Sequence, residues 1–350
     1  MKKYYTRACN FYYGFFSKQL VKKKLSLPLC GSKSISFDKI EIFLRDKNKI
    51  SSKVIDIKKI NLLPTIVKNK VLFDIKKITS KRKFFNQTYI MGILNMTPDS
   101  FSDGGVYNKK DKALSRIKSM VNSGADIIDV GGESTRPGSK IISTHDEWKR
   151  IKIIIKNFKK KYPKVLLSVD TRKSKIMSDS IKFNADIIND VSCFTFNEDS
   201  ISIIKNKNIW KVIHHMQGTP QTMQKNPKYD HVLLDIYDFF ESQITKLKKI
   251  KYSNKIVVDP GIGFGKNLKH NLMILNKISL FHSLGFPILI GASRKKFISQ
   301  IAKKFDTRER LGGTISSIIF ALTQGTQIFR VHNVKDTKQG ILIFKKLLNQ

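Results

Sequence analysis

Eight short apolar runs, separated by longer amphipathic segments, dominate residues 88–350 and constrain the fold more than any other feature of the sequence. The runs are Tyr89–Leu94, Asp126–Val130, Val165–Val169, Ala185–Ile188, Lys211–His215, Lys255–Val258, Pro287–Ile290 and Gln327–Val331. The helical patterns are Lys110–Asn122, Asp146–Lys160, Thr171–Phe183, Leu233–Lys249, Asn267–Ser283, Arg308–Gln324 and Lys335–Leu348. Strands that alternate with helices indicate parallel β/α units. Eight such units in about 260 residues predict an α/β fold of the closed (β/α)8 TIM-barrel type.

Polar residues stand where these runs end. In a barrel of this type the chemistry lies at the carboxyl ends of the strands. The sequence therefore predicts a ring of acids, amides and cations around one mouth of the barrel. In chain order its members are Asn95, the stretch 131–138, Asp170, Asn189, Asp190, His215, Met216, Gln217, Asp259, Ser293, Arg294, Lys295, Arg330 and His332.

The chain divides near residue 87, with a basic N-terminal extension over residues 1–86 and the barrel domain over residues 87–350. The extension holds 22 Lys and Arg against 5 Asp and Glu, and its first 37 residues contain no acid. Such a segment has the composition of an organelle-targeting peptide, and the alternative is an extension that is partly disordered or shaped by a biased genome. Three apolar stretches, Ile40–Leu44, Val54–Ile60 and Val71–Ile75, are candidates for short strands.

The net charge of +39 would ordinarily indicate a polyanionic partner. The cations, however, are mostly Lys scattered along the chain, without the interleaved basic and aromatic stripe of a nucleic-acid-binding fold. We therefore expect no nucleic-acid partner. No apolar run approaches the roughly 18 residues that a membrane span requires. The three cysteines, Cys9, Cys30 and Cys193, lie too far apart for a zinc motif or a disulfide framework.

Ordered motifs carry a family resemblance. The string 91–105 (MGILNMTPDSFSDGG) resembles the first signature of the dihydropteroate synthases, and 129–138 (DVGGESTRPG) resembles the second. Further matches, in the family's order, are SVDT at 168–171, IND at 188–190, HMQG at 215–218, DPGIGFGK at 259–266, GASRK at 291–295 and RVH at 330–332. The resemblance covers about residues 88–349, which accommodates the whole barrel. A set of this length is far more specific than a lone glycine-rich string.

The resemblance implies a transferase of folate biosynthesis that joins a pterin diphosphate to 4-aminobenzoate. Asp259 would accept two hydrogen bonds from the pterin, which is the strong, charge-assisted form of pairing. Asn189 offers both donor and acceptor to the rest of the ring edge. The other expected pterin-binding residues are Asp170, Met216, Phe264 and Lys295. A slot for 4-aminobenzoate would be shaped by Thr135, Pro137, Phe264 and Ser293.

The leaving diphosphate needs cations and donors as its bond to carbon breaks. The resemblance implies Asn95, Arg136, Arg330 and His332 in this role, with Mg²⁺ bridging phosphate oxygens. Mg²⁺ keeps several waters and takes few protein ligands, so Asn95 is the expected metal ligand. Asp170, Lys295, Arg330 and His332 are the expected catalytic residues, which act by position and charge. Loops 97–105 and 134–138 are expected to cover the site and exclude water.

Each residue taken alone has a plainer interpretation. Asp170 could be a helix cap, Asn95 and Asn189 could be turn residues, and Met216 and Phe264 could be core side chains. Asn333 stands where the family commonly has Asp, which puts a supporting contact in doubt. Two other functions remain open at this level: a pterin-binding barrel that passes a methyl group to a cobalamin protein, and a binding-only relative. The resemblance suggests a homodimer. A cytoplasmic location is expected, with an organelle as the alternative.

Overall fold

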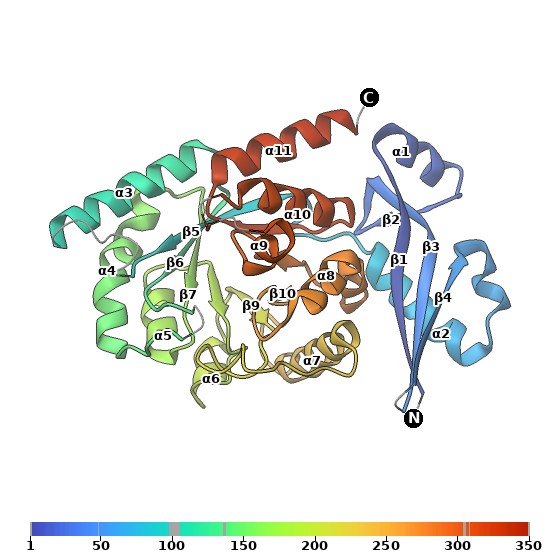
Figure 1. Ribbon diagram of the computed structural model, residues 1–350, viewed down its shortest axis with the longest axis horizontal. Helices are drawn as coiled ribbons and strands as arrows, with labels where there is room; N and C mark the ends of the chain where they lie inside the picture. The colour runs from blue at the N-terminus through green and yellow to red at the C-terminus, as the bar shows by residue number, and fades with distance from the viewer. Residues whose placement is uncertain are drawn as a thin grey trace.

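The computed structural model describes residues 2–47, 49–97, 106–135, 138–303, 306–307 and 309–348, with the backbone alone for residues 106–109. Eight parallel strands form a barrel on one side of the molecule, and an antiparallel sheet lies beside it (Figure 1). The barrel strands are β5 (Tyr89–Asn95), β6 (Ile127–Gly131), β7 (Leu166–Asp170), β8 (Ile187–Asp190), β9 (Trp210–His214), β10 (Ile256–Asp259), β11 (Leu289–Ile290) and β12 (Ile328–Val331). All eight predicted runs are therefore strands.

The barrel closes between β10 and β11. The strand order is β10-β9-β8-β7-β6-β5-β12-β11, and an isolated parallel bridge between Val258 and Ile288 joins its two ends. The Val258 amide donates to the Pro287 carbonyl across this joint, at 2.9 Å. The prediction of a closed TIM barrel is confirmed.

Helices surround the strands, and their bounds follow the predicted patterns within a few residues. They are α3 (Val106–Asn122), α4 (Thr144–Lys161), α5 (Ser174–Lys182), α6 (Ser200–Ile204), α7 (Val232–Leu247), α8 (Leu268–Asn276), η3 (Ile278–Leu284), α9 (Lys296–Ala302), α10 (Leu311–Thr323) and α11 (Val334–Leu347). The short helices α6 and α9 were not predicted, because neither is long enough to show a helical period. The predicted helix 267–283 is two elements, α8 and the 3₁₀ helix η3, which meet at Lys277.

Aromatic side chains close the end of the barrel at which the strands begin. Phe85, from the segment that leads into β5, packs edge-on against Tyr89 and Trp210, with ring centroids 4.9 and 4.7 Å apart. These rings belong to a cluster that fills the interior with side chains from β5, β6, β8, β9, β10, β11 and β12. The opposite end, where the strands finish, is left for polar residues.

The N-terminal segment is a folded domain. It contains β1 (Lys3–Tyr13), α1 (Gly14–Lys22), β2 (Leu27–Leu29), β3 (Ser32–Asp46), β4 (Lys49–Asp56), η1 (Ile57–Leu62) and α2 (Thr65–Thr79). The long strand β3 pairs with β1 on one edge and with β2 and β4 on the other. The expectation of partial disorder does not hold for the described residues, because these strands form a continuous ladder. Of the three candidate strands, 40–44 lies in β3, 54–60 is split between β4 and η1, and 71–75 is helical.

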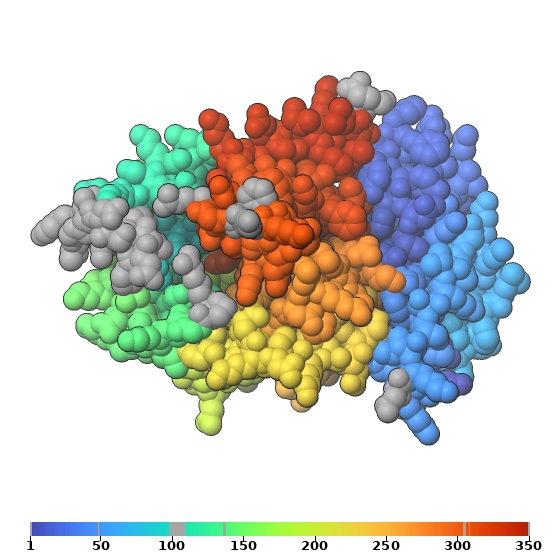
Figure 2. Space-filling model, in the orientation of Figure 1, coloured from blue at the N-terminus to red at the C-terminus, as the bar shows by residue number. Residues whose placement is uncertain are grey.

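The sheet is covered on both faces. Ala8, Ile40 and Ile42 pack with Val67 and Val71 of α2 in a core of their own. Tyr5 and Phe43, which point the other way, belong to the core of the barrel. Figure 2 shows the N-terminal domain seated directly against the barrel. The alternation of β1 and β3 thus serves two cores at once, as expected when successive side chains point to opposite faces.

Candidate active site

Register places one row of polar residues across four neighbouring strand ends. Asn95 of β5 pairs with Gly131 of β6, Gly131 with Asp170 of β7, and Asp170 with Asn189 of β8. On the far side of β9, Asp259 pairs with His214. Because parallel strands of a barrel end at one face, these side chains meet at its mouth.

A guanidinium joins two carboxylates at the floor of the mouth. Arg330 Nε lies 2.6 Å from Asp129 Oδ2, and its Nη2 lies 2.7 Å from Asp170 Oδ2. Asp129 also accepts hydrogen bonds from Ser168 Oγ at 2.6 Å and Asn189 Nδ2 at 3.3 Å. Asp129 is completely buried. A buried charge needs such a set of partners, so Asp129 holds Arg330 and Asn189 in place.

Asp129 was not among the predicted site residues, and Asp170 is not a helix cap. The sequence could have indicated Asp129 as a site residue, because it lies inside the 129–138 motif, two residues before the strand ends. The cap interpretation of Asp170 is wrong because α5 begins only at Ser174, and the Asp170 carboxylate accepts from Arg330 instead.

Two acceptors face the hollow above this floor. Asn189 Oδ1 is buried and has no hydrogen-bond partner among the described residues. One oxygen of the buried Asp259 carboxylate accepts from the Gly261 amide at 2.8 Å, and burial raises the pKa of Asp259 to about 6. An unpaired buried acceptor is rare in folded proteins and requires an explanation. A ligand edge that carries N–H donors would satisfy both side chains.

Cations at the mouth balance these acids. Lys295 Nζ lies 3.9 Å from the centroid of the Phe264 ring. Burial lowers the pKa of Lys295 to about 8, and the neighbouring Arg330 charge acts in the same direction. Burial also raises the pKa of Asp170 to about 7, although Arg330 opposes this shift. The site therefore holds groups that change charge near neutral pH, which is common at functional sites.

The hollow at the mouth contains seven of the predicted residues. They are Thr135, Asp170, Asn189, Asp259, Phe264, Lys295 and Arg330. Val191, His214, Ile262 and Gly291 also line it and were not predicted. His214 is buried and its Nδ1 has no partner among the described residues, so it adds a second unpaired group to the wall. Burial lowers the pKa of His214 well below its usual range, which keeps the ring neutral.

The other predicted residues do not line this hollow. His332 Nδ1 lies 3.0 Å from the Ser293 hydroxyl, which also accepts from the His332 amide at 3.2 Å. Met216 lies half-buried in the loop after β9. Asn95 ends β5, and its side chain makes no hydrogen bond to the residues that the structure describes. Arg136, Pro137 and most of the loop 97–105 lie outside the described residues.

The glycines after β10 allow two loops to pack closely. A Cβ on Gly261, where φ is +69°, would stand 2.0 Å from the His215 carbonyl oxygen. Only glycine fits there. The close approach at Gly261 is to the loop after β9. Asn333, whose substitution put a contact in doubt, keeps one: its Oδ1 accepts from Arg294 Nη2 at 2.7 Å.

Buried ion pairs anchor the loop after β6. Glu133 lies 2.9 Å from Arg172 and 3.2 Å from Lys173, and Lys173 also reaches Glu147 at 2.6 Å. Thr171 donates to the same Glu147 at 2.6 Å. The residue after Asp170 and the start of the 134–138 loop are thus fixed to α4 through one network.

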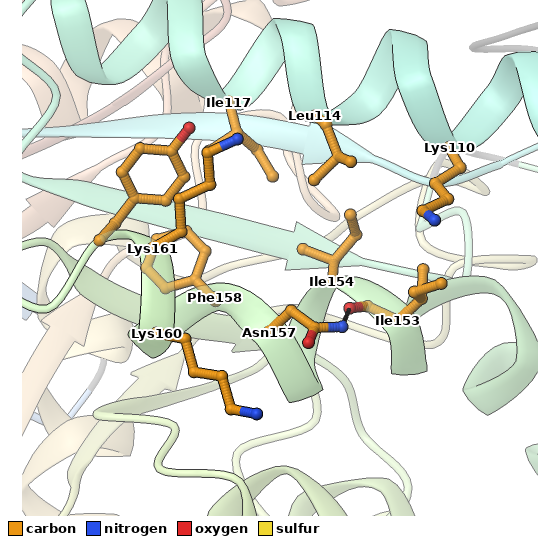
Figure 3. A pocket seen from close by; sticks show the side chains of 10 residues that line it. Lys110, Leu114, Ile117, Ile153, Ile154, Asn157, Phe158, Lys160 and Lys161 are labelled. Carbon is orange, nitrogen blue, oxygen red and sulfur yellow. Dashed lines mark hydrogen bonds between the residues drawn. The ribbon is translucent and has the colours of Figure 1, made fainter.

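A larger hollow of about 550 Å³ lies on the outer wall of the barrel between α3 and α4. Figure 3 shows Leu114, Ile117, Ile154 and Phe158 between the two helices, with lysines around them. Within the described residues no carboxylate lines it. Its size therefore does not make it the better candidate, because the acids, amides and cations that could direct a reaction converge at the barrel mouth and not between these two helices.

Comparison with known proteins decides the family. A family profile described as pterin binding enzyme matches residues 91–332. This chain belongs to the pterin-binding enzyme family. The Escherichia coli K12 dihydropteroate synthase is 39% identical over 262 residues, which is 75% of this chain and 92% of that protein.

Solved structures agree with this pterin-binding enzyme in fold. A Yersinia pestis dihydropteroate synthase in complex with a sulfonamide drug is 37% identical, with a TM-score of 0.70 over 76% of this chain and 96% of the other. A Xanthomonas albilineans dihydropteroate synthase with 4-aminobenzoic acid is 30% identical, with the same TM-score over 75% of this chain and 94% of the other. The family match begins at residue 91, so the N-terminal domain lies outside it.

Proposed function

We propose that this pterin-binding enzyme is a dihydropteroate synthase. It condenses (7,8-dihydropterin-6-yl)methyl diphosphate with 4-aminobenzoate and releases 7,8-dihydropteroate and diphosphate. One observation carries the proposal within the site: the unpaired Asn189 acceptor and the Asp259 carboxylate line the same hollow as Lys295 and Arg330. Acceptors beside cations match a substrate that joins an N–H-rich heterocycle to phosphates.

The pterin is held by its ring edge. The Asp259 carboxylate accepts from the amino group and a ring N–H, and Asn189 Oδ1 accepts a further donor. Phe264 and Met216 offer apolar faces to the ring, and Lys295 donates to its carbonyl. Asn189 Oδ1 is buried and unpaired without substrate. A donor on the ligand would therefore satisfy this acceptor without breaking an existing hydrogen bond, and would remove the free-energy cost of leaving it unpaired.

Arg330 moves when the substrate enters. The hollow is only about 20 Å³, less than a bicyclic ring needs, and Arg330 lines it while paired with Asp129 and Asp170. The diphosphate offers this guanidinium a stronger partner, together with His332, Asn95 and Arg136. Arg330 then leaves its ion pair with Asp170, so its positive charge no longer neutralises that carboxylate. The Asp170 carboxylate faces the pterin carbon.

The reaction is a substitution at the pterin methylene carbon. Its bond to the diphosphate oxygen breaks and leaves both electrons on oxygen, where the cations receive the charge. The 4-aminobenzoate nitrogen then forms the new C–N bond and gives up a proton. The ionised Asp170 stabilises the positive charge on the pterin meanwhile. Thr135, Pro137, Phe264 and Ser293 position the aminobenzoate; Ser293, now bonded to His332, can turn its hydroxyl to the carboxylate.

Mg²⁺ accompanies the diphosphate in this proposal. Asn95 fits as the protein ligand, because its carboxamide makes no hydrogen bond to the described residues and its oxygen could therefore bind the ion. Among those residues no group of three or more His, Cys, Asp or Glu could hold a metal. A single amide ligand suits an ion that arrives with phosphate and keeps its waters. When bound, the ion neutralises phosphate charge.

We further propose that the protein works as a homodimer in the cytoplasm. A symmetric dimer is the commonest assembly of soluble enzymes. No helix among the described residues has the length and apolarity to cross a bilayer. An organelle remains the alternative location, and it would require that the N-terminal domain survive import.

The test is product formation by purified protein. With the pterin diphosphate, 4-aminobenzoate and Mg²⁺, we expect dihydropteroate and diphosphate in equal amounts. Omission of the amine should abolish dihydropteroate. Diphosphate release without the amine-containing product, or methyl transfer from a methyl-folate in its place, would refute the proposal. Asn95→Ala should raise the Mg²⁺ concentration needed for half-maximal rate; an unchanged requirement would exclude Asn95 as its ligand.

A further inference from the structure

The boundary between the N-terminal domain and the barrel contains a cysteine in an unusual environment. Cys30 lies in the turn between β2 and β3 with φ of +51°, and its amide donates to the Ile78 carbonyl at 2.8 Å. Cys30 is partly exposed, whereas Cys9 and Cys193 are buried. This turn faces the amino-terminal end of β12, opposite to the end that carries His332.

A histidine lies within hydrogen-bond distance of this thiol. The Cys30 Sγ lies 3.4 Å from His282 Nδ1. The other ring nitrogen, Nε2, lies 2.9 Å from the Gln324 carbonyl oxygen. A carbonyl oxygen can only accept, so in the neutral ring Nε2 carries the hydrogen and Nδ1 is free to accept. The side-chain amide of Gln327 donates to the sulfur from 3.4 Å, which favours the thiolate.

A buried arginine lies near this thiol without a carboxylate partner among the described residues. Arg82 is 7% exposed, and its Nη2 donates to the His282 carbonyl at 3.4 Å. Its Nε is buried without a partner, and no carboxylate of the described chain lies within ion-pair distance of it. Buried charges are normally paired with an opposite charge. The charge of Arg82 acts on the Cys30 thiol, so a thiolate there would give this guanidinium an opposite charge.

The three thiols differ accordingly. Burial by itself raises the pKa of Cys30, but the charge and hydrogen bond of His282 and the charge of Arg82 bring it to about 7. Burial raises the pKa of Cys9 and of Cys193, and neither shift is reversed by a neighbour. The charged groups that face Cys30 come from two elements: His282 from η3 and Arg82 from the segment between α2 and β5.

We propose that Cys30 is a site of oxidation by hydroperoxides, with His282 as its base. His282 Nδ1 takes the thiol proton, and the sulfur attacks the terminal oxygen of the peroxide. An S–O bond forms as the O–O bond breaks; the leaving oxygen takes the electron pair and the proton from His282. The products are a sulfenic acid and water or an alcohol, so sulfur is oxidised and peroxide reduced. This chemistry is separate from the pterin transfer and stands without it.

The first test needs no variant. Full-length protein is treated with isotope-labelled iodoacetamide across a pH series, and each cysteine is quantified by peptide mass spectrometry. We expect Cys30 to react with a midpoint near pH 7, while Cys9 and Cys193 in the same sample stay unlabelled. Hydrogen peroxide followed by dimedone should label Cys30 alone. In urea all three thiols should titrate together near the ordinary thiol pKa of about 8.5.

Two variants test the proposed environment. Arg82→Gln should raise the Cys30 midpoint and slow alkylation at pH 7 by about fivefold, the loss of thiolate that a one-unit rise from a pKa of about 7 gives at that pH. Lys33→Gln, exposed at the start of β3 beside this turn, is the matched control and should leave the midpoint unchanged. Transferase activity and circular dichroism check that both variants fold. A native Cys30 that reacts no faster than Cys9, or a midpoint that Arg82→Gln does not move, would overturn the proposal.

Discussion

At the scale of single residues, function depends on charges that the fold holds close together. Asp129 is the clearest example: it accepts hydrogen bonds from Ser168, Asn189 and Arg330, and the last two line the hollow. It is a positioning residue in our proposal, since its buried carboxylate has no free face toward the hollow. We expect substitutions of the side chains that line the hollow above Asp129 to affect the reaction most.

Removal of a pterin-binding charge should reduce activity strongly. We expect Asp259→Asn and Lys295→Ala each to lower kcat/KM by roughly 10- to 150-fold, from the roughly 1.5–3 kcal/mol of a charge-assisted hydrogen bond. Lys112→Ala, exposed on α3, is the matched control and should remain within twofold of the wild type, roughly the scatter of surface changes. Steady-state kinetics at saturating Mg²⁺ would measure this. An equal loss in the control would show that the site is misplaced.

The pH dependence of the reaction should be bell-shaped. Asp259 and Asp170 have pKa values raised to about 6 and about 7, so their ionised forms are lost as pH falls through those values. The pKa of Lys295 is lowered to about 8, so its charge is lost as pH rises. We expect kcat/KM, which reports the free enzyme, to be highest between these limits. Lys295→Arg should keep the charge and remove the alkaline limb; an alkaline limb that stays in this variant would assign it to another group.

At the scale of elements, α7 supplies the acidic partners of the basic N-terminal domain, while β1 and α2 pack on η3. Its acids Asp235, Asp238 and Glu241 follow each other at helical spacing and face the sheet. Asp238 accepts from Tyr5 at 2.9 Å and from Arg45 at 2.8 Å. The cations on β1 and β3 thus find their counterions on a helix of the barrel 190 or more residues away. Some of the basic residues that give this segment the composition of a targeting peptide therefore belong to its interface with the barrel.

Neutralisation of this acidic row should loosen the domain. We expect Asp238→Asn to lower the free energy of unfolding by about 1 kcal/mol, a modest value because the pairs are partly exposed and screened. Glu198→Gln, exposed near α6, is the matched control. Urea denaturation measures the change, and limited proteolysis should cut the segment 80–88 sooner. Equal stability of both variants would mean that apolar contacts alone dock the domain.

At the scale of the whole molecule, the chain is two cores joined by one sheet. Tyr5 packs edge-on against Tyr237 with centroids 5.3 Å apart, and the Tyr13 hydroxyl donates to Thr323 at 2.8 Å. Strand β1 pairs with β3 over almost its full length. Loss of β1 would expose the inner face of β3 and the surface of η3, so the first residues belong to the folded unit.

We therefore expect β1 to be needed for a folded, soluble protein, because it pairs with β3 and packs against the barrel. A chain that lacks residues 2–37 should be largely insoluble when expressed. A mature N-terminus near residue 38 with full activity would instead support the targeting interpretation.

The sequence alone determined the strands and the long helices of the barrel, and the end of the barrel at which polar residues gather. Strand and helix periods are local patterns, so all eight strands could be predicted within two residues, and polar residues at their ends follow from parallel connectivity. It did not determine the Asp129 network, the small hollow that Arg330 and Lys295 line, or the docking of β1 and β3 on α7. Nor did it pair Cys30 with His282, 252 residues apart. These contacts were decided by the tertiary structure. They join side chains that are far apart in the sequence, and no local periodic pattern indicates which of them will meet.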